Sequence, residues 1–278
     1  MGTFLRTEKT LGYEYQIKGY STLPSFNVHP IIRLACHTID SLENLFDFKN
    51  PNSMVNRYNN GQVRLHETPE LFQNVMGKCL FWQKETDGLF SPFNKSMIHQ
   101  GYNGNIFDPQ GILKSFSMQI LSEVMSGFEL NDYSITVWGD TLISNTHQLA
   151  EDWILNIAQP LTVKEYKTNI ISLNFENTHM KAIAKSNLQD NMENIWLPQI
   201  STPKVQDFLE TTIISKDIIA ADVWSLVALV EGQAVVERIQ AYNQKMVNSN
   251  QTENTIEGMF LTGDYEYVFT EGFRQYIV

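Results

Sequence analysis

The chain is poor in cysteine, in basic residues and in long apolar runs, and each shortage argues against a class of protein. Only two cysteines occur, Cys36 and Cys79, and no CxxC spacing joins them. Their separation argues against the metal and redox chemistry that such spacing supports. Both lie in apolar patterns of helical period, so we predict two buried free thiols.

Positive charge is also scarce. Across 278 residues the formal net charge is −11, whereas a surface that binds nucleic acid needs concentrated Lys and Arg. Residues 1–10 contain no apolar run of the signal-peptide type and no lipobox cysteine follows. We also expect no segment long and apolar enough to cross a bilayer. The sequence therefore predicts a soluble cytoplasmic protein with no nucleic-acid or membrane partner, and it leaves the oligomeric state open.

The common catalytic signatures are missing as well. The motifs GxSxG, GxxxxGK[ST] and HExxH do not occur, and neither does the Rossmann glycine fingerprint. The six histidines are scattered, with no spacing typical of metal ligands. A lone histidine is more often a surface or satisfied core residue than a catalyst. Function must therefore be inferred from weaker patterns.

What the chain does have is a globular composition. Apolar residues make up 42% and aromatic residues 12% of it, which is compatible with a large buried core. No internal repeat, low-complexity tract or linker interrupts the chain. We therefore predict a single domain over residues 1–278.

Apolar residues at spacings of three and four predict a series of helices. Pro30 stands where a first helical turn tolerates proline, and Gly127 is the expected C-terminal cap of a later helix. The predicted helices cover residues 30–46, 69–86, 110–127, 219–230 and 234–242.

Alternating apolar residues predict strands between these helices. Gly139 and Asp140 are expected to form a hairpin turn between two of them. The order of helices, then strands, then helices and strands favours an α+β fold, with mixed or antiparallel sheets and flanking helices, over a strict βαβ alternation. The predicted strands cover residues 13–17, 133–137, 141–144, 153–157, 171–175, 259–261 and 265–269.

Seven short segments, in order along the chain, resemble the motifs of the FAD:protein FMN transferase (ApbE) family. They are Asn52–Asn59 for S-E-x-S-R-[FLY]-N, Thr86–Pro92 for T-D-G-x-F-D-P, Gln110–Phe116 for G-G-I-A-K-G-[YF], Val137–Asp140 for the G-G-D hairpin, Ala182–Asn187 for A-[VI]-A-T-S-G, Asn194–Pro198 for H-I-x-D-P, and Ala221–Leu226 for A-D-x-x-[AS]-T. No single segment is specific, but their joint order is. The resemblance implies an ApbE-like, T-fold-related architecture that binds FAD and Mg²⁺ and transfers FMN to a Thr or Ser hydroxyl of an acceptor protein.

The resemblance places a Mg²⁺ ligand at Asp222. A carboxylate near the start of an apolar helix must be paired, protonated or bound to a cation, and Mg²⁺ prefers oxygen ligands. A plain helix N-terminal carboxylate stabilised by the helix dipole is the alternative interpretation. The family's metal-binding Thr falls on Leu226, so Ser225, one residue earlier and about 100° around the helix, is the candidate hydroxyl ligand.

The same resemblance implies a flavin-nucleotide site. Lys114 would neutralise a phosphate, and Gly111 would allow close backbone approach at a helix N-terminus. An exposed helical lysine is the alternative interpretation of Lys114. Gly139 and Asp140 would contact the nucleotide, although such a hairpin needs no ligand to explain it.

Three further residues complete the implied cofactor site. Tyr58 and Asn59 would line the flavin or adenine pocket, with ordinary loop packing as the alternative. Ser186 belongs to it through its place in the segment Ala182–Asn187.

Several polar positions depart from the family's pattern. Asn194 stands where the family's His would move a proton, and an asparagine cannot take up a proton at neutral pH. Leu197 replaces the carboxylate of the same motif, so the catalytic residue is unknown. The other replacements are Ser91 for Asp, Ser115 for Gly, Lys185 for Thr and Asn187 for Gly.

Two kinds of function follow, and whether the chain is an enzyme stays open. The first is an FMN transferase with impaired activity, since loss of a general base typically costs ~10²–10⁴-fold in rate. The second is a non-catalytic flavin- or nucleotide-binding pseudoenzyme or interaction module.

Overall fold

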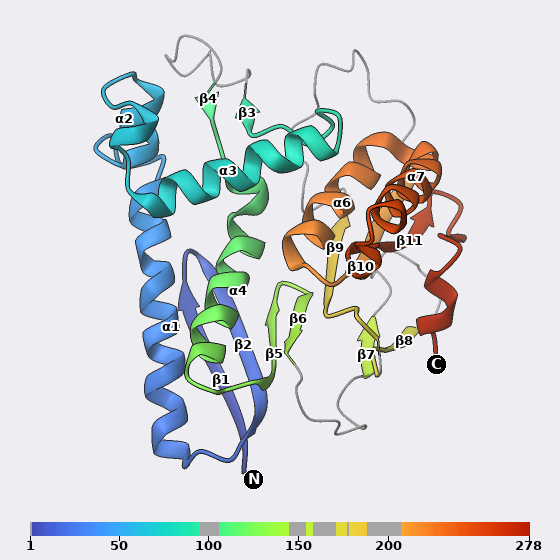
Figure 1. The fold of residues 1–278 in the computed structure, drawn as a ribbon, viewed down its shortest axis with the longest axis horizontal. Coiled ribbons are helices and arrows are strands. Elements are labelled where there is room, and N and C mark those ends of the chain that lie inside the picture. The colour runs from blue at the N-terminus through green and yellow to red at the C-terminus, as the bar shows by residue number, and fades with distance from the viewer. Residues whose placement is uncertain (1, 95–105, 145–153, 158–170, 177, 188–206) are drawn as a thin grey trace. The chain divides into compact units, whose positions relative to one another are not determined.

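The computed structural model describes residues 2–94, 106–144, 154–157, 171–176, 178–187 and 207–278. The chain divides into two compact units, one of residues 1–144 and 192–201 and the other of residues 145–191 and 202–278. Each unit pairs an antiparallel sheet with helices (Figure 1). The single domain over residues 1–278 stays a prediction.

The sheet of the first unit contains four antiparallel strands in the order β1, β2, β5, β6. Strand β2 agrees with the alternation predicted from residue 13 onward, and β5 and β6 agree with the predicted hairpin. Strand β1 was not predicted, because its more buried side carries Arg6, Glu8 and Thr10 beside Phe4 and so gives no alternation of apolar and polar residues. The bounds are β1 Gly2–Thr10, β2 Tyr13–Ser21, β5 Asp132–Val137 and β6 Asp140–Ser144.

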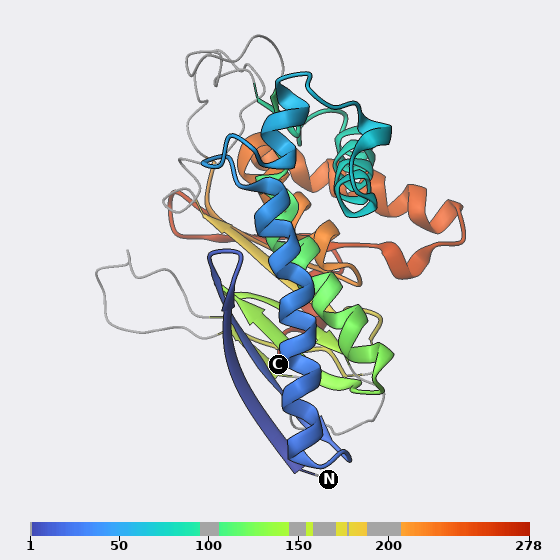
Figure 2. The same ribbon diagram turned by 90° about the vertical axis from the view of Figure 1, so that its left-hand side faces the viewer.

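Two long helices, α1 (Ser25–Phe46) and α4 (Gln110–Gly127), lie side by side on one face of this sheet (Figure 2). Apolar side chains from both helices and from the strands form the core between them. These side chains are fully buried: Tyr15, Ile17, Ile32, Ile39, Leu42, Leu121, Met125 and Ile135.

The ends of both long helices differ from the prediction. Helix α1 begins at Ser25, so Pro30 lies inside it rather than in its first turn; the extended backbone of Pro24 (φ −55°, ψ 143°) provides the earlier start. At the end of α4 the left-handed residue is Glu129 (φ +60°) and not Gly127. The chain turns there so that Leu130 is buried, and its N–H donates to the Met125 carbonyl at 3.1 Å.

Shorter elements complete the first unit. Helix α3 (Glu70–Glu85) matches the predicted helix, whereas α2 (Met54–Asn59) occupies a segment that has the composition of a turn. The Ser53 side chain starts α2 by accepting a hydrogen bond from the Asn56 N–H at 3.3 Å. The remaining elements are η1 Leu65–Glu67, β3 Phe93–Asn94 and β4 Ile106–Phe107.

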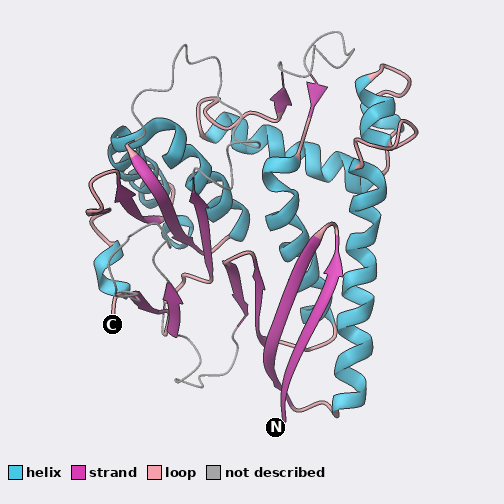
Figure 3. Ribbon diagram, turned by 180° about the vertical axis from the view of Figure 1, so that it is seen from behind, coloured by secondary structure: helices cyan, strands magenta, loops and turns pink. Residues whose placement is uncertain are grey.

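In the second unit, antiparallel strands follow the order β9, β10, β11, β12 (Figure 3). Helix α6 packs on β9 and β10. Strand β10 was not predicted, because it is buried on both faces and so shows no alternation of apolar and polar residues. The strand bounds are β9 Ala182–Asn187, β10 Phe208–Ser215, β11 Glu257–Thr262 and β12 Tyr267–Phe269.

The other elements of this unit follow the predicted order. The two late helices are separated at Gly232, whose φ of +67° breaks the helix. A separate antiparallel pair, β7 and β8, matches the strands predicted at residues 153–157 and 171–175. The bounds are β7 Ile154–Ile157, β8 Ile171–Asn174, α6 Ile218–Glu231, η4 Gly232–Ala234, α7 Val235–Asn248, η5 Thr252–Asn254 and η6 Phe273–Tyr276.

One stretch of the second unit is more apolar than we expected from the sequence. Residues Ile218–Asn248 are long and apolar enough, by length and composition, to cross a membrane. Within the fold, 67% of the most apolar window of this stretch is buried. A core helix of a soluble protein passes the same test of length and composition, so this observation is weak evidence for a membrane.

Candidate functional site

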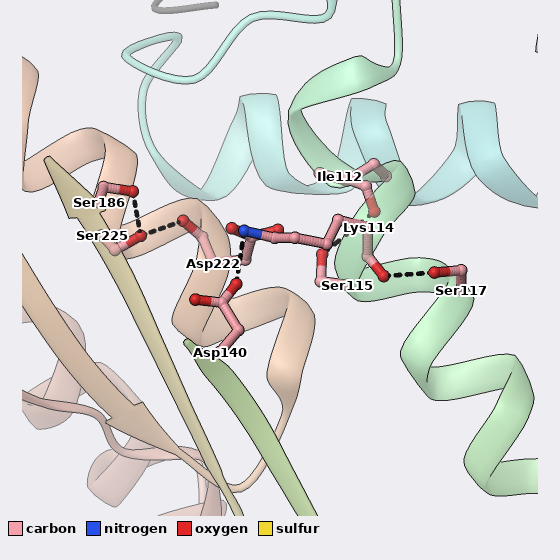
Figure 4. Close-up of polar contacts among 8 residues, drawn as sticks. All are labelled: Ile112, Lys114, Ser115, Ser117, Asp140, Ser186, Asp222 and Ser225. Atoms are coloured by element: carbon pink, nitrogen blue, oxygen red, sulfur yellow. Dashed lines mark hydrogen bonds and ion pairs between the residues drawn. The ribbon is translucent and has the colours of Figure 1, made fainter. Parts of the chain in front are cut away.

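Lys114 and Asp140 form an ion pair inside the first unit (Figure 4). The Lys114 Nζ lies 2.5 Å from the Asp140 Oδ2, and the side chains are 18% and 0% exposed. The alternative interpretation of Lys114 as an exposed surface lysine is therefore wrong. A fully buried carboxylate needs a counter-charge, and Lys114 provides it.

The hairpin between β5 and β6 places Asp140 at this point. Asp140 is opposite Val137 in the register, so the two turn residues are Trp138 and Gly139, and not Gly139 and Asp140 as predicted. Their φ angles are +50° and +92°, as a two-residue hairpin turn of the I′ type requires. Asp140 is thus the first residue of β6, and its side chain points inward.

Hydrogen bonds also fix the helix that carries Lys114. The Ser117 hydroxyl donates to the Lys114 carbonyl at 2.6 Å, and its oxygen lies 2.7 Å from the Tyr15 hydroxyl on β2. Burial raises the pKa of the Tyr15 phenol, so Tyr15 remains a neutral hydrogen-bonding group. Helix α4 is therefore tied to the sheet by polar contacts as well as by its apolar face.

The N-terminus of α4 is largely satisfied from within the chain. The Asp108 Oδ1 accepts from the Gln110 N–H at 3.0 Å, and the Pro109 carbonyl accepts from the N–H groups of Ile112 and Leu113 at 2.9 and 3.2 Å. Gly111, the second residue of the helix, keeps the remaining N–H of this turn. Within the described residues, this helix end thus offers a phosphate little beyond the Gly111 N–H and the Lys114 side chain.

Tyr58 and Asn59 hold β4 against α2. The Asn59 amide donates to the Phe107 carbonyl at 2.9 Å and accepts from the Phe107 N–H at 2.9 Å. The Tyr58 ring lies 5.6 Å from that of Phe72 and 6.2 Å from that of Phe107. These contacts favour loop packing for both residues, and their proposed contact with a cofactor stays a prediction.

A chain of hydroxyl groups joins β9 to α6 in the second unit (Figure 4). The Ser225 hydroxyl donates to the Asp222 carbonyl at 2.7 Å and lies 2.8 Å from the Ser186 hydroxyl. The Thr211 hydroxyl donates to the Ser225 carbonyl at 2.8 Å. The structure thus brings together Ser186, Asp222 and Ser225, three of the residues predicted for the site.

Asp222 is the fifth residue of α6 and is 4% exposed. It lies beyond the first helical turn, where Asp217 already caps the helix by accepting from the Ile219 N–H at 2.8 Å. The helix dipole acts mainly within the first turn, so the interpretation of Asp222 as a plain N-terminal carboxylate is not supported. A carboxylate this deeply buried calls for a partner of opposite charge or for hydrogen bonds.

Asp222 offers one carboxylate to a hard cation, and the nearby Ser225 hydroxyl donates to the Asp222 backbone carbonyl. Mg²⁺ needs only one or two carboxylates besides water and phosphate oxygens. Among the described residues no group of three or more His, Cys, Asp or Glu side chains could hold a metal ion. The donor set therefore fits a Mg²⁺ held jointly with a nucleotide better than a dedicated protein cage.

An ion pair in the second unit was not predicted. The Lys185 Nζ lies 3.6 Å from the Glu210 Oε1, and the side chains are 20% and 11% exposed. Burial raises the pKa of Glu210, and Lys185 opposes this rise. Lys185 and Ser186 are consecutive strand residues, so they point to opposite faces of the sheet, and the pair lies on the face away from α6. The ion pair could not be predicted because it depends on the pairing of β9 with β10, and β10 gave no sequence signal.

Not every predicted residue can be placed. Asn194 and Leu197 fall in residues 188–206, which lie outside the described residues. Ser91 is described, and its hydroxyl accepts from the Phe93 N–H at 3.3 Å. The replacement of the family's His and Asp by Asn194 and Leu197 is therefore inferred from the sequence alone.

Comparison with known proteins gives one kind of match. No family model and no curated protein sequence matches the chain. Among solved structures, flavin transferase ApbE from Vibrio cholerae superposes with a TM-score of 0.71 at 14% identity, covering 99% of each chain. The ApbE protein from Thermotoga maritima gives 0.70 at 16% identity, again covering 99% of each chain. The apo form of flavinyl transferase ApbE from Pseudomonas stutzeri gives 0.72 at 13% identity, covering 99% of this chain and 96% of that one.

The fold is ApbE-like. This confirms the α+β class with flanking helices and the architecture that the seven ordered segments indicated. At such identity the likeness establishes the architecture. Activity, cofactors and acceptor have to be argued from the residues of this chain.

Proposed function

We propose that the protein binds FAD with Mg²⁺ and transfers FMN from it to a Thr or Ser hydroxyl of a partner protein, at a reduced rate. The observation that supports this most is the ApbE-like fold, which extends over 99% of this chain and of the flavin transferase from Vibrio cholerae. The ion pair of Lys114 and the hydroxyl chain at Asp222 fall on segments whose order along the chain resembles that family.

The proposed reaction is a phosphoryl transfer. The acceptor hydroxyl attacks the FMN phosphorus of FAD, the pyrophosphate P–O bond breaks, and AMP leaves with the bridging oxygen while the hydroxyl proton is lost. A bound Mg²⁺ would offset the charge that develops on the pyrophosphate oxygens. By the resemblance of their segments, Asp222 would hold the ion in the second unit, and Lys114 and the Gly139 turn of the first unit would bind the nucleotide.

The reduced rate follows from the residue at the expected proton-transfer position. Asn194 cannot accept the hydroxyl proton at neutral pH, so the acceptor would attack without general-base help, at a cost of ~10²–10⁴-fold. The alternative proposal is a flavin-binding module without transfer. It is favoured by Asn194 and by the fact that Asp140 already balances the charge of Lys114.

Incubation with FAD and Mg²⁺ separates these functions. AMP release by chromatography reports cleavage of FAD, and absorbance of the desalted protein near the flavin bands reports binding. We expect bound flavin with AMP release far slower than that of an ApbE enzyme assayed in parallel. Bound flavin with no AMP supports the binding module, and absence of both contradicts the proposal. AMP release as fast as that of the parallel enzyme contradicts the proposal that Asn194 reduces the rate of transfer.

Substitution of Asp222 tests the metal site. Asp222→Ala removes the only carboxylate that we assign to Mg²⁺, so we expect the Mg²⁺-dependent part of FAD binding to disappear in a fluorescence titration with and without EDTA. Asp217→Ala is the matched control, because it removes a carboxylate from the same helix and costs a cap of about 1 kcal/mol. The assignment of Asp222 is wrong if its variant keeps the Mg²⁺ dependence of the wild type.

A further inference from the structure

Strand β1 has an open edge. It is the first strand in the order β1, β2, β5, β6, so among the described strands only one of its edges is paired (Figure 2). The strand is nine residues long, contains no proline and pairs with β2 without a bulge. Soluble proteins commonly protect such an edge by shortness, proline or a bulge. None of these three protects β1, so its open edge can accept a further strand.

The turn between β1 and β2 fixes which backbone groups face that edge. Leu11 and Gly12 have φ angles of +54° and +74° and form a two-residue hairpin turn. The flanking residues, Thr10 and Tyr13, are therefore a hydrogen-bonded pair, and the antiparallel ladder repeats this pairing at every second residue of β1. The residues between them direct their N–H and C=O groups to the open edge, where these groups have no partner among the described residues. They are exposed, and they are Thr3, Leu5, Thr7 and Lys9.

Arg6 and Glu8 lie on the other face of β1 and are both half-buried. The Arg6 Nε donates to the His29 Nδ1 at 2.5 Å, which uses one of the five donors of the guanidinium. Among the described residues Glu8 forms no ion pair, and Arg6 and Glu8 do not pair with each other. Charges on an edge strand oppose the addition of a further strand, unless that strand offers charges of the opposite sign at the matching positions.

We propose that the open edge of β1 pairs antiparallel with the same edge of a second copy of this chain, with Thr7 on the two-fold axis. In this register Arg6 lies opposite Glu8 of the partner subunit, and the symmetry makes this pair twice. Thr7 then lies opposite its own copy and Leu5 opposite Lys9, so the outward backbone groups meet as a hydrogen-bonded ladder requires. An axis at Arg6 or at Glu8 would place like charges opposite each other, and an axis at Leu5 would leave both charges unmatched.

The mass of the protein in solution tests the association itself, independently of flavin binding. Two paired strands bury less area than a standard interface, so we expect a dimer that dissociates on dilution, with a Kd on the order of micromolar. Sedimentation equilibrium over a range of concentrations should give the mass of two chains at the upper end and of one chain at the lower end. A monomer at every concentration would overturn the proposal and leave the edge to a strand of another protein.

Charge reversal tests the register. Arg6→Glu and Glu8→Arg each place like charges opposite each other twice in the dimer, so each should weaken association on the order of tenfold or more. The variant that carries both substitutions restores opposite charges and should associate nearly as well as the wild type. Arg33→Glu, at an exposed position of α1, makes the same change of charge away from the edge and should leave association unchanged. A double variant as weak as the single ones would show that the register is wrong.

Cross-linking tests the position of the axis without changing a charge. The Cα atoms of a hydrogen-bonded antiparallel pair are about 5.5 Å apart, within the range that a disulfide spans. Thr7→Cys should therefore give a disulfide-linked dimer under mild oxidation, seen by electrophoresis without reductant. Leu5→Cys is the control, because its two copies would lie four residues apart along the paired strands, about 13 Å. Both native cysteines are buried, and circular dichroism shows that each variant is folded. No cross-link at position 7, or equal cross-linking at both positions, contradicts the proposal.

Discussion

Asp108 shows how strongly a single residue can depart from solution behaviour in this fold. Its side chain is 3% exposed at the start of α4, and burial raises its pKa from 3.8 to about 6, against the hydrogen bond from the Gln110 N–H, which lowers it. The folded state therefore holds a proton that the unfolded chain gives up at lower pH. The stabilisation is complete below about pH 4 and is lost as the pH rises through about 6.

Substitution of Asp108 tests this linkage. Asp108→Asn keeps an oxygen for the Gln110 N–H but has no charge to bury. The stability of the variant should therefore not decrease through this residue as the pH rises. We expect the unfolding free energy of the variant, relative to that of the wild type, to rise by about 2 kcal/mol between pH 4 and pH 7. Urea denaturation across this range measures it. Asp264→Asn, on an exposed loop, is the control, and a flat difference for Asp108→Asn would contradict the buried charge.

Some site residues could be predicted from the sequence and others could not. Ser186, Asp222 and Ser225 were predicted from ordered segments, and the structure joins the two serine hydroxyls to each other and to the backbone carbonyl of Asp222. The ion pairs of Lys114 with Asp140 and of Lys185 with Glu210 were not predicted. Such pairs depend on which strands and helices become neighbours, and local spacing does not contain that information.

The hairpin of β5 and β6 is the element on which the position of Asp140 depends. Its turn places Trp138 and Gly139 in the left-handed region, where a side chain costs about 1–2 kcal/mol. A Cβ at Gly139 would meet nothing within 4 Å. The need for glycine at this turn is therefore conformational and not one of space.

A pair of glycine substitutions separates these two causes. We expect Gly139→Ala to lower the unfolding free energy by about 1–2 kcal/mol. Gly77, inside α3, has equally open space around a Cβ and no positive φ. Gly77→Ala should therefore raise the unfolding free energy by up to about 1 kcal/mol. Thermal or urea unfolding measures both, and equal effects of the same sign would contradict the conformational argument.

Among the elements, amphipathic helices were the most predictable. Helices α3 and α4 agree with the predicted segments within a few residues, because one face of each is buried. Helix α6 agrees as well, although its run from Ile218 to Ser225 is buried on all sides. Strand β10 gave no signal, since its residues are buried irrespective of face. The start of α1 was predicted too late, because we took Pro30 for a residue of the first turn and the helix accommodates it further inside.

At the scale of the whole molecule, the order of weak segments was more informative than any one of them. The chain shares 13–16% identity with the ApbE structures that it matches over nearly its whole length. Such a fold is preserved by burial and hydrogen bonding, which many sequences satisfy. Among the described segments, Asn52–Asn59, Thr86–Pro92, Gln110–Phe116 and Val137–Asp140 lie at turns or helix starts, where few residues satisfy the backbone.

The apolar stretch Ile218–Asn248 leads to a prediction for the intact protein. Because 67% of its most apolar window is buried in the second unit, we propose that it is a core element and that the protein is cytoplasmic. After lysis without detergent and ultracentrifugation, we expect the protein in the supernatant and monodisperse on gel filtration. Recovery only from the pellet after addition of detergent would contradict this.

The hydroxyl chain in the second unit has a fixed direction. Ser225 has a single hydroxyl hydrogen, and it is directed at the Asp222 carbonyl, so Ser186 must supply the hydrogen between the two serines. The Ser186 oxygen then faces its surroundings with lone pairs only. It is an electron-rich point that suits a magnesium ion, a sugar hydroxyl or a ring N–H, and it would repel the bare oxygen of a phosphate.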